Sequence, residues 1–136
     1  MIVIDHGFED FFRELDQLVG KEVAVGIHDA EVAEYAAYNE FGAVGVPQRS
    51  FLRSTFDAEQ DNVISMFADW FNTTQSLMSA AQATGDEFAW FVKMKIDGGD
   101  FTPNAPSTIK AKGHSRPLIH TGRMRNSIKS VMRGSR

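Results

Sequence analysis

The sequence predicts an α+β fold in which several helices, one of them long, pack on a small antiparallel sheet. Several stretches repeat apolar residues at the helical period of about 3.6, which is typical of amphipathic helices. Residues 21–27 instead alternate at the period of two that strands show. A length of 136 residues with 43% hydrophobic content fits one domain over residues 1–136 with its own core.

The first helix is expected over residues 7–19, after Asp5 as N-cap and before Gly20 as terminator. Its apolar stripe consists of Phe8, Phe11, Phe12, Leu15, Leu18 and Val19. Residues 21–27 then form a strand. A second helix is expected over 30–41, capped by Asp29 and ended by Gly42.

A long helix is predicted over residues 51–78, with a break near 72–74, where Asn-Thr-Thr is a run of poor helix formers. Thr84 and Glu87 have the spacing of a capping box, which predicts that a further helix begins there and runs to about residue 96. Apolar side chains beyond what a small core can hide indicate a subunit interface.

The last third of the chain predicts a short helical turn at 107–112, a turn at 121–125 and a strand at 126–133. This strand should pair with residues 22–27, because a lone strand leaves its backbone groups without partners. Residues 101–118 are expected to be a basic, partly flexible loop region within the single domain.

Charge is divided unevenly along the chain, whose formal net charge is −4. Residues 1–100 hold all eighteen acidic and six of the basic residues, whereas residues 101–136 hold eight basic and no acidic ones. The two parts therefore carry −12 and +8. Such a division indicates an interaction tail, a nucleic-acid contact or a self-complementary assembly.

Several classes of chemistry lack their sequence signatures. The chain has no cysteine, so it has neither disulfides nor a thiol nucleophile. No apolar run approaches a membrane span, and no leader pattern precedes residue 20, so a soluble protein of a cytoplasm is expected. The histidines lack the spacing of a zinc hydrolase, and no Gly-x-Ser-x-Gly or phosphate loop occurs. We therefore expect no enzyme, metal or cofactor.

Three segments resemble a known series. They are residues 35–42 (Tyr-Ala-Ala-Tyr-Asn-Glu-Phe-Gly), 46–53 (Val-Pro-Gln-Arg-Ser-Phe-Leu-Arg) and 117–128 (Pro-Leu-Ile-His-Thr-Gly-Arg-Met-Arg-Asn-Ser-Ile). Together they resemble the tail-completion and neck proteins of tailed bacteriophages, also described as virion-morphogenesis or tail-component proteins. The similarity covers about residues 22–131. Ser50 stands where that group usually has proline.

The resemblance implies a non-enzymatic structural protein at the head–tail junction, with helices against a small sheet, that assembles as a ring such as a hexamer. Its partners would be further copies of itself, connector or head-closure proteins and tail-tube proteins, with non-specific contact to DNA in the channel. Its location would be the virion neck, and the host cytoplasm during assembly. No membrane and no small-molecule substrate are implied.

Within this interpretation, Gly42 and Pro47 set a turn that presents Arg49, Phe51 and Arg53. Thr121 and Gly122 set a second turn that aims Arg123 and Arg125 at a neighbouring subunit or at DNA. The candidate interaction residues are Asn39, Glu40, Arg49, Phe51, Arg53, Arg116, Arg123 and Arg125. The pair Asn39 and Glu40 is either a helix-end contact or part of a site.

Two other functions remain open from the sequence. The basic third would suit a small nucleic-acid-binding module, since phosphate contact needs only positive surface charge. Stacking on single-stranded bases is disfavoured, because Phe101 is the only aromatic residue after Phe91. A metal-dependent hydrolase using the histidines is a third alternative.

Overall fold

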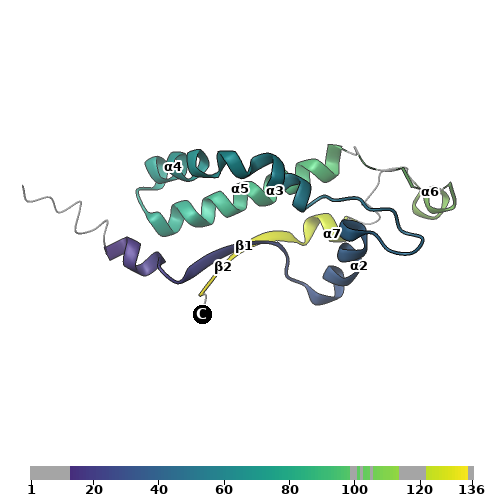
Figure 1. Ribbon diagram of the computed structural model, residues 1–136, viewed down its shortest axis with the longest axis horizontal. Coiled ribbons are helices and arrows are strands. Elements are labelled where there is room, and N and C mark those ends of the chain that lie inside the picture. The colour runs from purple at the N-terminus through teal and green to yellow at the C-terminus, as the bar shows by residue number, and fades with distance from the viewer. Residues whose placement is uncertain (1–12, 99–100, 102, 105, 114–121, 135–136) are drawn as a thin grey trace, which may run out of the picture.

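A computed structural model describes residues 13–98, 101, 103–104, 106–113 and 122–134 of the chain. Residues 13–18 are helical. The elements that follow are β1 (Lys21–Ile27), α2 (Ala30–Phe41), α3 (Arg53–Glu59), the 3-10 turn η1 (Gln60–Asn62), α4 (Val63–Thr74), α5 (Leu77–Gly98), α6 (Pro106–Lys112), α7 (Arg123–Asn126) and β2 (Ile128–Gly134). The predicted α+β fold is confirmed, with one long helix packed on a two-stranded antiparallel sheet (Figure 1).

The sheet pairs the two strands that the sequence pattern predicts. β1 and β2 run antiparallel from the pair Lys21 and Gly134 to the pair Ile27 and Ile128. Glu22 lies opposite Arg133, and the Arg133 Nε donates to Glu22 Oε1 at 2.5 Å. Two-stranded ribbons are marginally stable in water. This one therefore depends on the helices that cover it.

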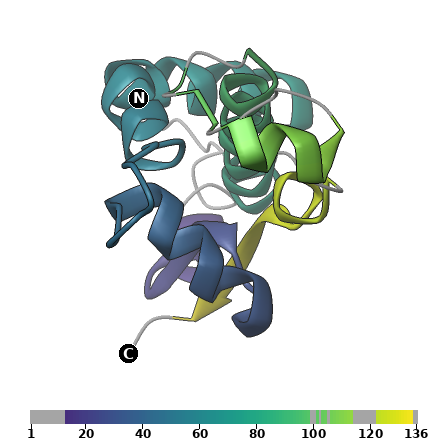
Figure 2. The ribbon, with the colours of Figure 1, turned by 90° about the vertical axis from the view of Figure 1, so that its right-hand side faces the viewer.

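The long helix α5 lies over the ribbon and contacts both strands, while α4 runs beside it in the same layer (Figures 1 and 2). The helix approaches both strands closely at Gly85. A Cβ there would lie 2.3 Å from Val23 Cγ1 and 3.0 Å from Ser130 Cβ. Since real Cβ atoms do not approach so closely, glycine allows the helix backbone to lie directly against the sheet.

The predicted helix start at Thr84 is wrong, because α5 already begins at Leu77. The Thr84 hydroxyl donates to the backbone oxygen of Ala80 at 2.7 Å, one turn earlier, instead of capping an end. The Glu87 carboxylate accepts from Trp70 Nε1 at 2.9 Å and ties α5 to α4. The capping-box pattern thus reflects side chains used for packing in the middle of a helix.

The single helix predicted over 51–78 is also wrong, since the structure divides it into α3, η1 and α4. Both α3 and α4 pack on α5, and Phe56 of α3 stacks on Phe88 of α5 at 5.0 Å between ring centroids. α4 ends at Thr74, within the predicted break, where Gln75 takes a left-handed conformation with φ 57°.

The core lies where α2, α5, α7 and β2 meet. Its buried members are Val32, Ala36, Phe51, Ala89, Val92, Ile96, Met124 and Ile128. The aromatic stripe of α4 (Phe67, Trp70 and Phe71) is only half-buried. Of the expected first helix, the structure describes residues 13–18, with Leu15 and Val19 exposed. Phe8, Phe11 and Phe12 lie outside the described residues.

Gly85→Ala should lower the free energy of unfolding by about 1–3 kcal/mol, the usual cost of overpacking a tight contact. At a helix position where the added Cβ meets no neighbour, the change from glycine to alanine stabilises the protein by up to about 1 kcal/mol. The matched control is Gly98→Ala near the end of the same helix, where a Cβ meets nothing within 4 Å. Urea denaturation of both variants measures the difference. Equal stability of the two variants would contradict the close approach.

Candidate interaction surface

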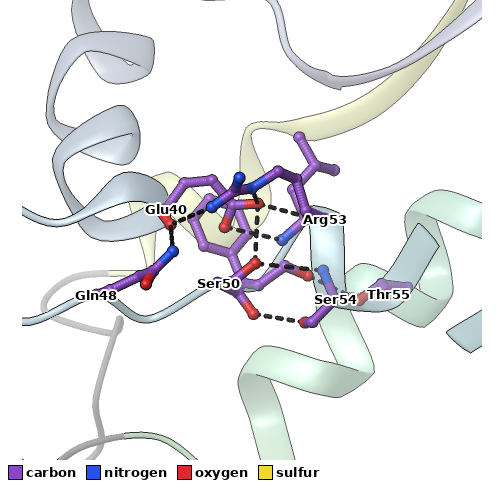
Figure 3. A network of polar contacts seen from close by, with 8 residues as sticks. Glu40, Gln48, Ser50, Arg53, Ser54 and Thr55 are labelled. Atoms are coloured by element: carbon purple, nitrogen blue, oxygen red, sulfur yellow. Dashed lines mark hydrogen bonds and ion pairs between the residues drawn. The ribbon is translucent and has the colours of Figure 1, made fainter. Parts of the chain in front are cut away.

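A buried carboxylate joins the end of α2 to the start of α3. Glu40 is 4% exposed. Its Oε1 accepts hydrogen bonds from Arg53 N at 2.5 Å and from Ser50 Oγ at 3.2 Å. Its Oε2 accepts from Leu52 N at 3.4 Å, and Arg53 Nε lies 3.6 Å from Oε1 (Figure 3). Glu40 therefore caps α3 from a different helix, satisfying N–H groups that a helix start leaves without partners.

Serines and a threonine complete this cap. Ser50 Oγ accepts from Ser54 N at 3.3 Å, and Ser54 Oγ donates to Ser50 O at 2.5 Å (Figure 3). The Thr55 hydroxyl donates to Phe51 O at 2.7 Å. We call Glu40, Ser50, Arg53 and Ser54 the Glu40 brace. Every buried polar side-chain atom of the brace has a hydrogen-bond partner, as buried polar groups require.

The backbone between α2 and α3 is held equally firmly. Arg49 N donates to Asn39 O at 2.6 Å, and Gln48 Nε2 donates to Glu40 O at 3.3 Å. Ala43 and Val46 exchange backbone hydrogen bonds of 2.9 Å around a tight turn. Gly42, with φ 80°, ends α2 in a conformation that favours glycine. The segment from 42 to 52 is thus a rigid turn.

This rigid turn and α2 expose apolar side chains to solvent. We call Tyr35, Tyr38, Phe41 and Val44 the α2 surface, whose members are between 38% and 105% exposed. The Arg53 guanidinium lies 4.5 Å from the centre of the Phe41 ring, in a cation–π contact. Aromatic side chains and arginine are enriched in protein interfaces. The composition of this region therefore favours binding to another protein.

The predicted arginines of the second turn meet carboxylates of their own chain. Arg125 donates to both oxygens of Asp97 at 2.8 Å, and this hydrogen bond and charge raise the pKa of Arg125. Arg123 lies 3.3 Å from Glu31 and 3.5 Å from Asp29, and its pKa is raised mainly by the hydrogen bond to Glu31. α7 is thereby joined to both α5 and α2.

The turn does not present all the residues expected of it. Phe51 is 2% exposed and belongs to the core, because α2, α5 and α7 close over it. Arg49 is 7% exposed and donates to Pro103 O at 3.1 Å, and burial lowers its pKa. Arg53 remains half-exposed. Asn39 donates from Nδ2 to Tyr35 O within α2. Arg116 and Thr121 lie outside the described residues.

The described part of the chain also bears on metal binding and membrane crossing. It contains no group of three or more His, Asp or Glu side chains that could hold a metal ion. His28 is exposed, and the other three histidines lie outside the described residues. Among the helices that the structure describes, none combines the length and apolar character needed to cross a membrane.

Comparison with known proteins found no matching family model, no matching curated protein and no matching solved structure.

Sequence reasoning missed two parts of the site. Ser50 stands two residues before Leu52, the N-cap of α3, so it lies outside the position at which serine commonly marks a helix start and gave no signal for the brace. The burial of Glu40 has no signal either. The segment 39–53 gives no indication that a carboxylate would fold back onto backbone N–H groups thirteen residues later in the chain.

Glu40→Ala should lower the free energy of unfolding by about 1–3 kcal/mol, because it leaves partly buried N–H groups at the start of α3 without their acceptor. Glu34→Ala is the matched control on the same helix. Glu34 is exposed and accepts only a 3.4 Å hydrogen bond from Tyr38 among the contacts seen, so a change within about 0.5 kcal/mol is expected. Thermal or urea unfolding measures both. Similar losses in the two variants would contradict the brace.

The bidentate pair of Arg125 and Asp97 should couple more strongly than the exposed pair of Arg133 and Glu22. Their side chains are 27% and 28% exposed in the first pair, against 59% and 48% in the second. Double-mutant cycles with alanine should give about 1 kcal/mol or more for the first pair, and less than about 0.5 kcal/mol for the second. A reversed order would contradict the geometry of α7.

Proposed function

We propose that this protein is a structural subunit of a tailed-phage or prophage particle, acting in tail completion or head–tail joining and assembling as a ring at the neck. The observation that supports this most is the way the Glu40 brace joins two segments of the resemblance. Residues 35–42 supply the carboxylate, and residues 46–53 supply the groups that it binds. The segments therefore work as one structural unit, as a shared fold signature would.

The third segment contributes to the same unit. Its described part, residues 122–128, includes α7 and the start of β2. Arg123 ties α7 to the start of α2, and Met124 and Ile128 enter the core beside Val32 and Ala36. Motifs far apart in the chain thus support a single helix, α2, from both ends. In the proposed function, this support holds the α2 surface in a fixed geometry for a partner.

A rigid apolar surface suits assembly better than catalysis. Partners that dock on a preorganised surface lose little conformational entropy at the interface, which favours repeated, identical contacts. In a neck ring, the α2 surface would meet a connector, head-closure or tail-tube protein. The aromatic side chains would then provide the buried centre of that interface, and Arg53 its polar rim.

The rival function is a small nucleic-acid-binding module. Exposed Lys110 on α6 and Lys129 on β2 favour it, because exposed cations attract phosphates without sequence preference. Within the described residues, however, Arg123, Arg125 and Arg133 are each paired with a carboxylate of the same chain. Such pairing leaves less of the basic third for phosphate contact.

Deleting the gene from the phage or prophage that encodes it tests the proposal. Full heads and separate tails should accumulate in electron micrographs, and supplying the protein in trans should restore joined particles. Phe41→Asp, which places a charge on the exposed α2 surface, should fold normally and fail to restore joining. Joined, infectious particles from the deletion would contradict the proposal. Tight binding of the purified protein to duplex DNA, with a steep dependence on salt, would favour the rival.

A further inference from the structure

An apolar groove lies between the helical layer and the ribbon. It has a volume of about 410 Å³, and its walls include Val23, Phe56, Val63, Ile64, Phe67 and Phe88. Ile64 is 81% exposed at its edge, and Phe56 and Val63 are each 37% exposed. Open apolar surface of this kind marks sites at which another surface binds.

The groove lacks the features of a small-molecule site. Such sites combine apolar walls with a few converging polar groups that orient the ligand. The polar side chain in the wall is Thr84, whose hydroxyl already donates to Ala80 O. The groove therefore suits an apolar segment or aliphatic side-chain stem from a macromolecule.

Acidic residues lie close in sequence to the groove-lining residues where α3 passes into α4. Between Ser54 and Val92 the sequence contains six acidic residues and no lysine or arginine. Two of them, Asp57 on α3 and Asp61 on η1, are exposed and lie within two residues of Phe56 and Val63, which line the groove. We call these two the acidic ridge. An occupant of the groove should therefore carry positive charge beside an apolar part.

The same chain offers such a group at one end of its long axis. α6 projects there, whereas α4 lies toward the other end (Figure 1). α6 exposes Lys110 and Ala111. Burial lowers the pKa of Lys112, and the charge of Arg49 lowers it further. The exposed Lys110 gives α6 a positive charge that carboxylates of another copy would attract.

We propose that α6 of one copy docks on the groove and acidic ridge of the next copy. This inference rests on the proposed function, since it names the contact through which the ring would form. A lysine side chain suits both parts of the site, because its aliphatic stem covers apolar surface while its ammonium group reaches carboxylates. Since the two surfaces lie on different parts of the chain, the contact is head-to-tail, and repetition closes a ring or extends a filament.

Disulfide trapping tests this contact directly, because the natural chain contains no cysteine. Ile64→Cys and Ala111→Cys, both at exposed positions, are made in separate chains and mixed under mild oxidation. The mixture should form a mixed disulfide dimer well above the yield of either variant alone. The matched control mixes Ile64→Cys with Val44→Cys, at the fully exposed tip of the α2 surface. Preferential trapping of that pair, or of Ile64→Cys with itself, would overturn the proposal.

Charge exchange provides a second, independent measurement. Lys110→Glu or Asp61→Lys alone should weaken self-association about tenfold in sedimentation experiments, since each places like charges in contact. A single chain carrying both changes should recover association. Loss without recovery would overturn the proposal. Neck particles that contain the chain, but in which the Ile64→Cys and Ala111→Cys variants form no mixed disulfide, would also overturn the proposed contact while leaving the proposed function intact. If deletion of the gene fails to separate heads from tails, that result counts against the proposed function alone.

Discussion

The fold depends on the contact between α5 and a ribbon of only two strands. Such a ribbon cannot bury enough apolar surface to persist alone. α5 supplies the missing cover by lying directly against Val23 and Ser130, which glycine at position 85 permits. Once α5 is placed, α3 and α4 pack along it on one side, and α2 and α7 close the core at its other end. The groove and the Glu40 brace both arise from this arrangement.

The sequence predicted correctly those elements whose bounds depend on residues close together in the chain. β1 and α2 have the predicted bounds, because alternation, the Asp29 cap and the Gly42 stop all act within a few residues. The start of α5 was mispredicted because Thr84 and Glu87 mimic a cap while their partners come from Ala80 and Trp70. The division of α3 from α4 and the burial of Glu40 were equally beyond prediction. Both depend on contacts made between elements, which no spacing along the chain records.

The structure shows where the unevenly divided charges of the chain lie. Part of the basic third is used internally, where Arg123, Arg125 and Arg133 fasten α7 and β2 to acidic partners. The exposed positive charge of α6 and the acidic ridge of α3 and η1 remain as separate surfaces. A chain with two such surfaces can bind copies of itself in series, whereas a uniform negative charge would keep copies apart. In the proposed assembly, the α2 surface would then be left to face a different partner.

Sedimentation velocity of the full chain, over a concentration series at low and at high salt, tests the central claim that copies join through opposite charges. The account predicts assemblies that grow with concentration at low salt and dissociate as salt screens the contact. A monomer at every concentration, or assemblies that salt leaves unchanged, would contradict it.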